Sequence, residues 1–149
     1  MSTDERVASQ LTKTLENGRL GYERAAERMK ESDRADLAEK FRQFASERAA
    51  MTAELEQLAA AYGDDIDDRS TIPGAVHRGW MVVKDILTGS DIGAVLNSAE
   101  RGEDHALEEY REAMASDISP DFRPVLEKQM AVVQSAHDFV RSVVRPGER

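Results

Sequence analysis

Cysteine is absent from the sequence, which excludes disulfide bonds, thiolate metal sites and cysteine nucleophiles. Aromatic residues are few, at 5% of the chain, and only four prolines occur in 149 residues. This composition favours a helical bundle over a sheet protein. Long apolar runs are missing too: none approaches the length of a membrane span, and the N-terminus lacks the apolar segment of a signal peptide. We therefore expect a cytoplasmic protein that does not interact with membranes.

Positive charge is scarce relative to negative charge. Twenty lysine and arginine residues stand against 29 aspartate and glutamate residues, which gives a formal net charge of −9. This excess argues against nonspecific binding of nucleic acid or of an anionic membrane surface, and it is compatible with attraction of cations. The length fits one domain, residues 1–149, with a single substantial core.

Apolar residues recur at alternating spacings of four and three, the pattern of a helix that buries one stripe of its surface. The sequence predicts helices at about residues 4–31, 33–62, 73–88, 91–117 and 120–144. Ser32 or Asp33 is expected to cap the second helix, and Ser119 or Asp121 the last. The helix at 73–88 is too short to match the others and is expected to cross over the bundle.

These lengths and connections predict an all-α fold. Four long helices joined by short, long and short connections form two antiparallel hairpins. The expected architecture is a ferritin-like four-helix bundle, with the short crossover helix between the second and third long helices.

Each long helix has one residue that interrupts its apolar stripe. These residues are Gly18, Arg48, Glu103 and His137, and counting from the hairpin turns places all four near one layer in the middle of the bundle. Glycine costs roughly 1 kcal/mol relative to alanine inside a helix, so we expect Gly18 to make room for the large side chain of Arg48. A carboxylate on a core stripe is costly unless a partner neutralises it.

One candidate partner for Glu103 is a metal ion. Helical bundles build such sites from a glutamate on each of two helices and a Glu-x-x-His pair on each of the other two. This chain departs from that pattern, because Ala50 stands where the second helix would supply histidine and Gln134 where the fourth would supply glutamate. The metal would be iron or manganese. The candidate ligands are Glu23, Glu47, Glu100, Glu103 and His137.

The other candidate partner is Arg48. Its guanidinium could bind Glu103 or Glu100 bidentately, with His137 taking a remaining hydrogen bond. Arginine would then supply the positive charge that metal ions supply elsewhere. Because the second helix lacks the histidine of a metal site, the sequence favours this ion pair. A single metal held by Glu100, Glu103 and His137 is an intermediate case.

Three segments carry a resemblance to a known family. They are N-G-R-L-G-Y at 17–22, A-V-H-R-G-W at 75–80 with the following L-T-G, and E-R-G-E-D at 100–104 with Tyr110. Over about residues 5–143 the chain resembles an uncharacterised bacterial family of ferritin-like four-helix-bundle proteins, a domain of unknown function. The resemblance implies the ferritin-like fold and a loose association with bacterial stress or envelope contexts, and it implies no demonstrated ferroxidase activity.

The sequence thus predicts a ferritin-like bundle of unknown biochemical activity. We expect a stress-associated interaction protein, without catalytic residues, that contains a buried polar layer and at most a degenerate metal site. The alternative is a di-iron or mono-metal carboxylate oxidase, or an iron-handling protein. A homodimer or another homo-oligomer is expected, although no sequence feature locates its interface.

Overall fold

The computed structural model describes residues 3–61 and 92–144 of the chain, and in these residues it contains four helices and no strand. The helices are α1 (Thr3–Glu31), α2 (Ala35–Ala61), α5 (Ile92–Ala115) and α6 (Arg123–Val143). The all-helical prediction is therefore confirmed. The crossover helix predicted at 73–88 lies outside the described residues. None of these four helices has the length and apolar character that crossing a bilayer requires.

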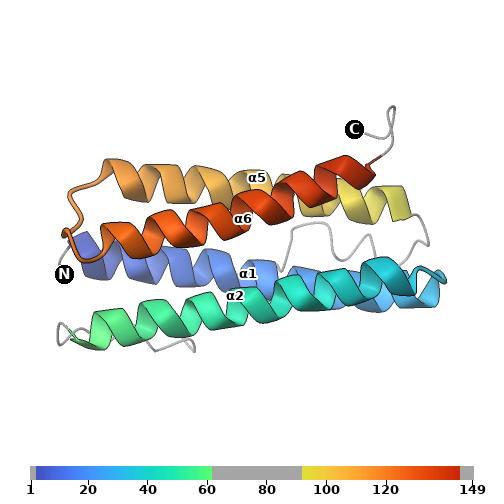
Figure 1. The fold of residues 1–149 in the computed structure, drawn as a ribbon, viewed down its shortest axis with the longest axis horizontal. Helices are drawn as coiled ribbons and strands as arrows, with labels where there is room; N and C mark the ends of the chain where they lie inside the picture. Colours follow the sequence, from blue (N-terminus) through green and yellow to red (C-terminus); the bar gives the residue numbers. More distant parts are fainter. Residues whose placement is uncertain (1–2, 62–91, 145–149) are drawn as a thin grey trace.

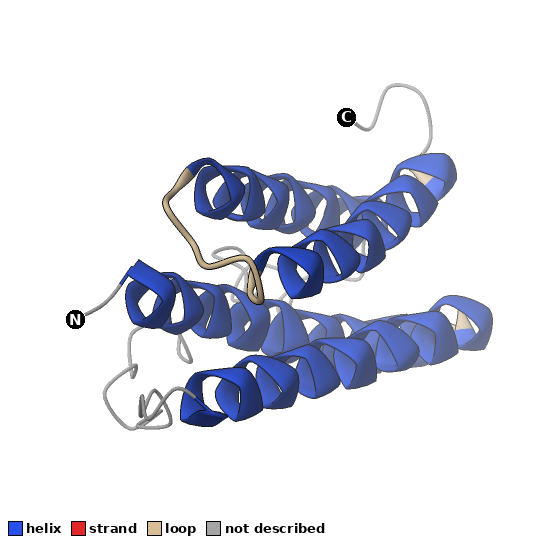
Figure 2. Ribbon diagram, turned by 60° about the vertical axis from the view of Figure 1, so that its left-hand side comes forward, coloured by secondary structure: helices blue, strands red, loops and turns tan. Residues whose placement is uncertain are grey.

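The helices form two antiparallel hairpins that pack as two layers. One layer contains α1 and α2, and the other contains α5 and α6 (Figure 1). Helices α1 and α6 begin at the end of the bundle that holds the N-terminus, whereas α2 and α5 begin at the opposite end. Seen from another side, the two hairpins remain stacked on each other (Figure 2). The described residues thus form a four-helix bundle, as the periodicity predicts.

The turn between α1 and α2 differs from the predicted helix cap. Asp33 has a positive φ of 63°, and its N–H bonds to the Lys30 carbonyl while the N–H of Arg34 bonds back to the Met29 carbonyl at 2.8 Å. This pair of bonds closes the C-terminus of α1, a position where a residue with left-handed backbone is common. Asp33 therefore ends the first helix and does not cap the second, which begins at Ala35.

The start of α6 also corrects a prediction. The N-cap position is held by Phe122, which makes no side-chain cap hydrogen bond, so neither Ser119 nor Asp121 is the cap. The N–H of Ser119 donates instead to the Asp4 carboxylate at 2.9 Å, which ties this turn to the start of α1. Phe122 is fully buried. Apolar anchoring, together with Pro124 in the first turn, sets the start of the helix.

The apolar core consists of two clusters of buried side chains, one towards each end of the bundle. Both clusters draw residues from all four helices. The cluster near the α1–α2 turn includes Tyr22, Met29, Phe41, Phe44, Leu96 and Val140. The cluster near the N-terminus includes Leu11, Leu15, Leu55, Tyr110, Leu126 and Val133. Gly18, Arg48 and Glu103 fall between these two clusters along their helices, whereas His137 lies between Ala136 and Val140 of the cluster near the α1–α2 turn.

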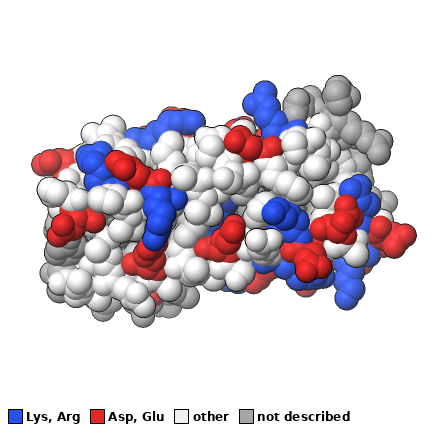
Figure 3. Space-filling model, in the orientation of Figure 1, with Lys and Arg blue, Asp and Glu red and all other residues white. Residues whose placement is uncertain are grey.

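The surface contributes little to this architecture. On the face drawn in Figure 3, lysine and arginine side chains lie among aspartate and glutamate side chains. Some pair along one helix, as Arg28 does with Glu31 at 3.0 Å. Exposed pairs of this kind contribute about 0–1 kcal/mol each, so the interior determines stability.

Candidate functional site

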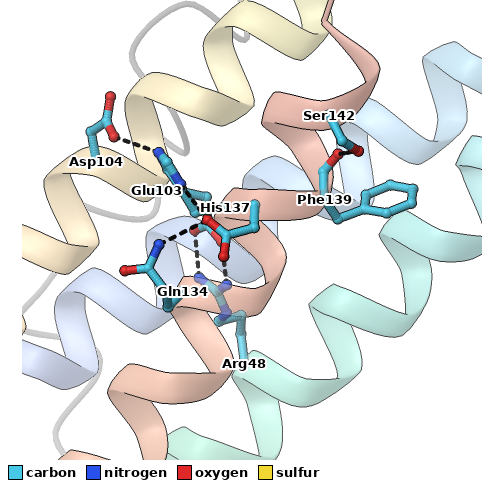
Figure 4. Close-up of polar contacts among 8 residues, drawn as sticks. Arg48, Glu103, Asp104, Gln134, His137, Phe139 and Ser142 are labelled. Atoms are coloured by element: carbon cyan, nitrogen blue, oxygen red, sulfur yellow. Dashed lines mark hydrogen bonds and ion pairs between the residues drawn. The ribbon is translucent and has the colours of Figure 1, made fainter.

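The interior polar layer is built on an ion pair between α2 and α5. Arg48 Nη1 donates to Glu103 Oε1 at 2.7 Å, and Arg48 Nη2 donates to Glu103 Oε2 at 2.5 Å. Each side chain is only 1% exposed. The parallel pairing of two N–H groups with two carboxylate oxygens is the bidentate geometry that guanidinium favours. The predicted pairing of Arg48 with Glu103 is confirmed (Figure 4).

Helix α1 makes room for this pair. A Cβ atom added at Gly18 would lie 3.2 Å from Arg48 Nη1 and 3.7 Å from its Cγ, so the guanidinium stem passes over the glycine backbone. The Tyr22 ring lies on the same side, with its centroid 5.4 Å from Arg48 Cζ, a distance suited to cation–π attraction. The glycine therefore has the role that the sequence predicts for it.

Burial and charge act in opposite directions on Arg48. Removal from water disfavours the guanidinium cation, but the attached Glu103 carboxylate outweighs that effect and raises the pKa of Arg48 above its ordinary value. Burial also raises the pKa of Tyr22 and of Tyr110, with the Glu103 charge adding to both shifts. At neutral pH the Arg48 guanidinium is therefore a cation, and both phenols are neutral.

His137 lies beside the ion pair but bonds elsewhere. Its Nε2 lies 2.8 Å from Asp104 Oδ1 on α5, and its Nδ1 lies 3.4 Å from Asp138 Oδ1. The Asp138 carboxylate also accepts a hydrogen bond from Gln134 at 2.9 Å. The expectation that His137 bonds to the Arg48 partner is therefore corrected. Both oxygens of Glu103 are already engaged, and Asp104, the next residue, reaches the imidazole.

The five candidate metal ligands occupy different environments. Glu103 is fully buried and His137 is nearly so, whereas Glu47 and Glu100 are half-buried. Glu23 is exposed and pairs with Arg19 at 2.7 Å. In the part of the chain that the structure describes, no three carboxylate or imidazole side chains form a group that could hold a metal ion.

Position 50 adds to this description. Ala50, where the di-iron pattern requires histidine, is exposed, so a side chain at that position faces solvent and not the polar layer. The structure thus brings Glu103 and His137 to neighbouring places on facing helices and joins Glu103 to Arg48. The metal-site hypothesis stays a prediction.

A second buried polar cluster lies towards the N-terminal end of the bundle, and sequence reasoning missed it. Gln129 is fully buried on α6. Its Oε1 accepts the hydroxyl of Tyr110 at 2.7 Å, and its Nε2 donates to Glu54 at 2.9 Å and to the Met51 carbonyl at 3.2 Å. Lys128 also pairs with Glu54. This cluster links α2, α5 and α6.

The signal for Gln129 was present in the spacing. The residues Leu126, Gln129, Val133 and Ala136 recur at intervals of three and four. This spacing is that of a buried stripe, and it is met by Gln129 as well as by the neighbouring Met130. The structure buries Gln129 fully and leaves Met130 half-exposed. A buried side-chain amide needs several hydrogen-bond partners, and the Tyr110 hydroxyl on α5 is one of them.

Comparison with known proteins shows the family of the chain. No curated protein and no solved structure matches the chain. Residues 6–116, which are more than half of the sequence and include α1, α2, Arg48 and Glu103, match the family described as "Domain of unknown function (DUF2383)". The chain belongs to the DUF2383 family.

Proposed function

We propose that this protein is a noncatalytic helical bundle that acts by binding other proteins, and that an internal ion pair takes the place of a metal centre. The observation that carries the proposal is the bidentate contact between Arg48 and Glu103, with both side chains 1% exposed. Carboxylate-rich bundles bind metal ions among their facing helices. Here a guanidinium fills the space next to the buried carboxylate.

The charge arrangement supports this role. Glu103 is the fully buried carboxylate of the layer, and both of its oxygens accept hydrogen bonds from Arg48. A divalent cation would have to displace the guanidinium from those oxygens and would bring two positive charges near it. The pair therefore stabilises the interior with one cation and one anion, and it fixes how the two hairpins face each other.

We also propose that the bundle has the ferritin-like connection. The support is the direction of the helices, since α2 and α5 both begin at the same end of the bundle. A single long connection between two hairpins is the feature of the ferritin-like topology. A role in bacterial stress responses is supported by the family resemblance of the segments around Gly18, Trp80 and Glu103.

The first test is anaerobic titration of the purified full chain with Fe(II), followed by exposure to air. We expect no stoichiometric binding and no rapid oxidation, and the same result for Glu27→Ala, a control at an exposed carboxylate of α1. A tight site with oxidation that disappears in Glu103→Ala would overturn the proposal in favour of the iron-handling alternative.

A second test asks whether Arg48 stands in for a cation. Arg48→Ala frees the Glu103 carboxylate, so Mn(II) or Zn(II) should raise the Tm of this variant. The same ions should leave the Tm of wild type and of Arg48→Ala with Glu103→Ala unchanged, because neither contains an unpaired buried carboxylate. Equal responses of the three proteins would show that the pair and a metal ion are not alternatives at this site.

A further inference from the structure

A cavity lies between α1 and α5 at the end of the bundle where α1 begins, away from the ion pair. Its volume is about 420 Å³, within the range of small-molecule sites. Its wall is formed by four residues of α1, three of α5 and the residue that follows the end of α5, and these are Arg6, Val7, Gln10, Leu11, Glu109, Glu112, Ala113 and Ser116. Nothing in the polar layer uses these residues.

The floor of this cavity is apolar. Val7, Leu11 and Ala113 are all less than a tenth exposed and belong to the core cluster of this end of the bundle. Alanine at 113 gives the cavity depth, because a larger residue there would fill the space between the two helices. A short aliphatic group therefore has a surface on which to pack.

The walls carry charges of both signs on opposite helices. Arg6 on α1 and Glu112 on α5 are exposed, and the side chain of neither makes a hydrogen bond or an ion pair with any residue of the described ranges. Glu109 on α5 is linked to α1 across the cavity, since its Oε2 accepts a hydrogen bond from the Gln10 side chain at 2.8 Å. Its side chain is only 14% exposed.

We propose that this cavity binds a small zwitterion with an aliphatic body, of the size of an amino acid or dipeptide. The anionic end pairs with the Arg6 guanidinium, and the cationic end pairs with Glu112 beside the held Glu109 carboxylate. The aliphatic body rests on Val7, Leu11 and Ala113. A zwitterion gains a charge pair at each wall, whereas a ligand of one charge gains a pair at only one wall, so the two walls together favour a zwitterion.

The experiment uses L-leucine as the probe, with two partial probes of similar shape. 4-Methylpentanoate keeps the carboxylate without the ammonium, and 3-methylbutylamine keeps the ammonium without the carboxylate. Each is titrated into the isotope-labelled full chain and followed by amide NMR shifts. We expect saturable shifts with leucine at the Gln10 side-chain amide and around Ala113, and weaker binding of both partial probes.

Matched variants decide which group each wall recognises. The Arg6→Gln variant should bind leucine no more tightly than it binds 3-methylbutylamine, because it no longer recognises the carboxylate. The Glu112→Gln variant should bind leucine no more tightly than it binds 4-methylpentanoate, because it no longer recognises the ammonium group. Because exposed pairs are weak, we expect each variant to lose about two- to fivefold in affinity for leucine. Glu108→Gln, an exposed carboxylate of α5 outside the cavity, should leave binding unchanged.

Three results would overturn the proposal. They are the absence of saturable shifts with leucine, equal binding by wild type and both charge variants, and binding of 3-methylbutylamine as tightly as leucine. Ala113→Phe should abolish binding of all three probes by filling the floor. Because Ala113 is part of the core, loss of binding in that variant can also come from loss of folding. The variants at the exposed Arg6 and Glu112 should fold normally, so they provide the decisive test.

Discussion

Replacing Arg48 with methionine is the most informative perturbation of this bundle. Methionine keeps much of the apolar stem but removes the cation, which leaves the fully buried Glu103 carboxylate without a partner. Breaking a buried pair on one side costs about 3–5 kcal/mol. Because both side chains are 1% exposed, water offers no screening that would reduce this figure.

Proton uptake by Glu103 gives an independent value for the stability that Arg48→Met should lose. The buried carboxyl group of the variant avoids its charge only by taking up a proton. A glutamate side chain in water has a pKa of about 4.3, so holding it protonated at pH 7 costs roughly 3.7 kcal/mol at 1.36 kcal/mol per pH unit. The two values agree. The loss is a large share of the roughly 5–15 kcal/mol that stabilises a typical domain.

The assay is urea unfolding followed by far-UV circular dichroism. We expect Arg48→Met to lose about 3–5 kcal/mol, and Arg48→Met with Glu103→Leu to recover most of it, because an apolar pair of similar volume replaces a buried ion pair at little cost. Arg42→Met, at an exposed arginine of α2, should change stability by less than about 0.5 kcal/mol. Simple additivity of the two single changes would refute the reasoning.

The pH dependence of this variant has a defined sign. Between pH 7 and about 4.3 the folded variant holds a proton that the unfolded chain does not, so its stability rises as the pH is lowered, by up to about 1.4 kcal/mol per unit. The double variant lacks the Glu103 carboxyl group and should therefore lack this slope. The same slope in both proteins would show that the buried carboxyl is not its source.

Three further predictions concern the neighbours of this pair and the second polar cluster. Gly18→Ala should raise the free energy of unfolding by less than the roughly 1 kcal/mol expected from helix propensity, because the new Cβ would meet Arg48 Nη1 at 3.2 Å. The full gain should appear when the same change is made in the Arg48→Met variant. Equal gains in the two proteins, measured by urea unfolding, would contradict this. Tyr110→Phe should cost about 1–3 kcal/mol in the same assay, because Gln129 Oε1 loses its donor; a loss of only a few tenths would argue against that hydrogen bond. Burial tends to raise the pKa of Glu54, but hydrogen bonds from a lysine and from Gln129 outweigh it and lower the pKa below 4.5. The Glu54 carboxylate should therefore contribute to stability above about pH 4.5, and this contribution should be lost as the pH falls through the lowered pKa. The loss of unfolding free energy caused by Glu54→Gln should accordingly disappear in acid. A loss that grows in acid would contradict this assignment.

The helix stripes and the ion pair follow from periodicity. Spacings of four and three determine which residues of a helix face its neighbours, and a rise of about 1.5 Å per residue places residues on adjacent helices at the same height. Those two rules set Gly18 beside Arg48 and leave Glu103 and Glu100 as possible partners of Arg48, and the structure shows that the partner is Glu103. They work because each residue is the single interruption in an otherwise apolar stripe.

The partner of His137 shows the limit of such counting. Neighbouring residues of a helix point about 100° apart, and counting across a hairpin turn locates a residue only to about one position. Glu103 and Asp104 are therefore equivalent by count, and the structure gives the imidazole to Asp104. Asp33 illustrates a different limit, because aspartate suits both a helix start and a left-handed helix end. Only the backbone shows that it adopts the second.

The layer between the two core clusters has a consequence for how the bundle opens. Each half holds its own set of buried apolar side chains from all four helices, while the layer between them is joined by the contact of Arg48 with Glu103. Local opening of one half exposes that half's cluster and leaves the other closed. Amide hydrogen exchange should therefore divide the helices into two protection groups that meet at Gly18, Arg48 and Glu103, and Arg48→Met should lower protection first at that boundary.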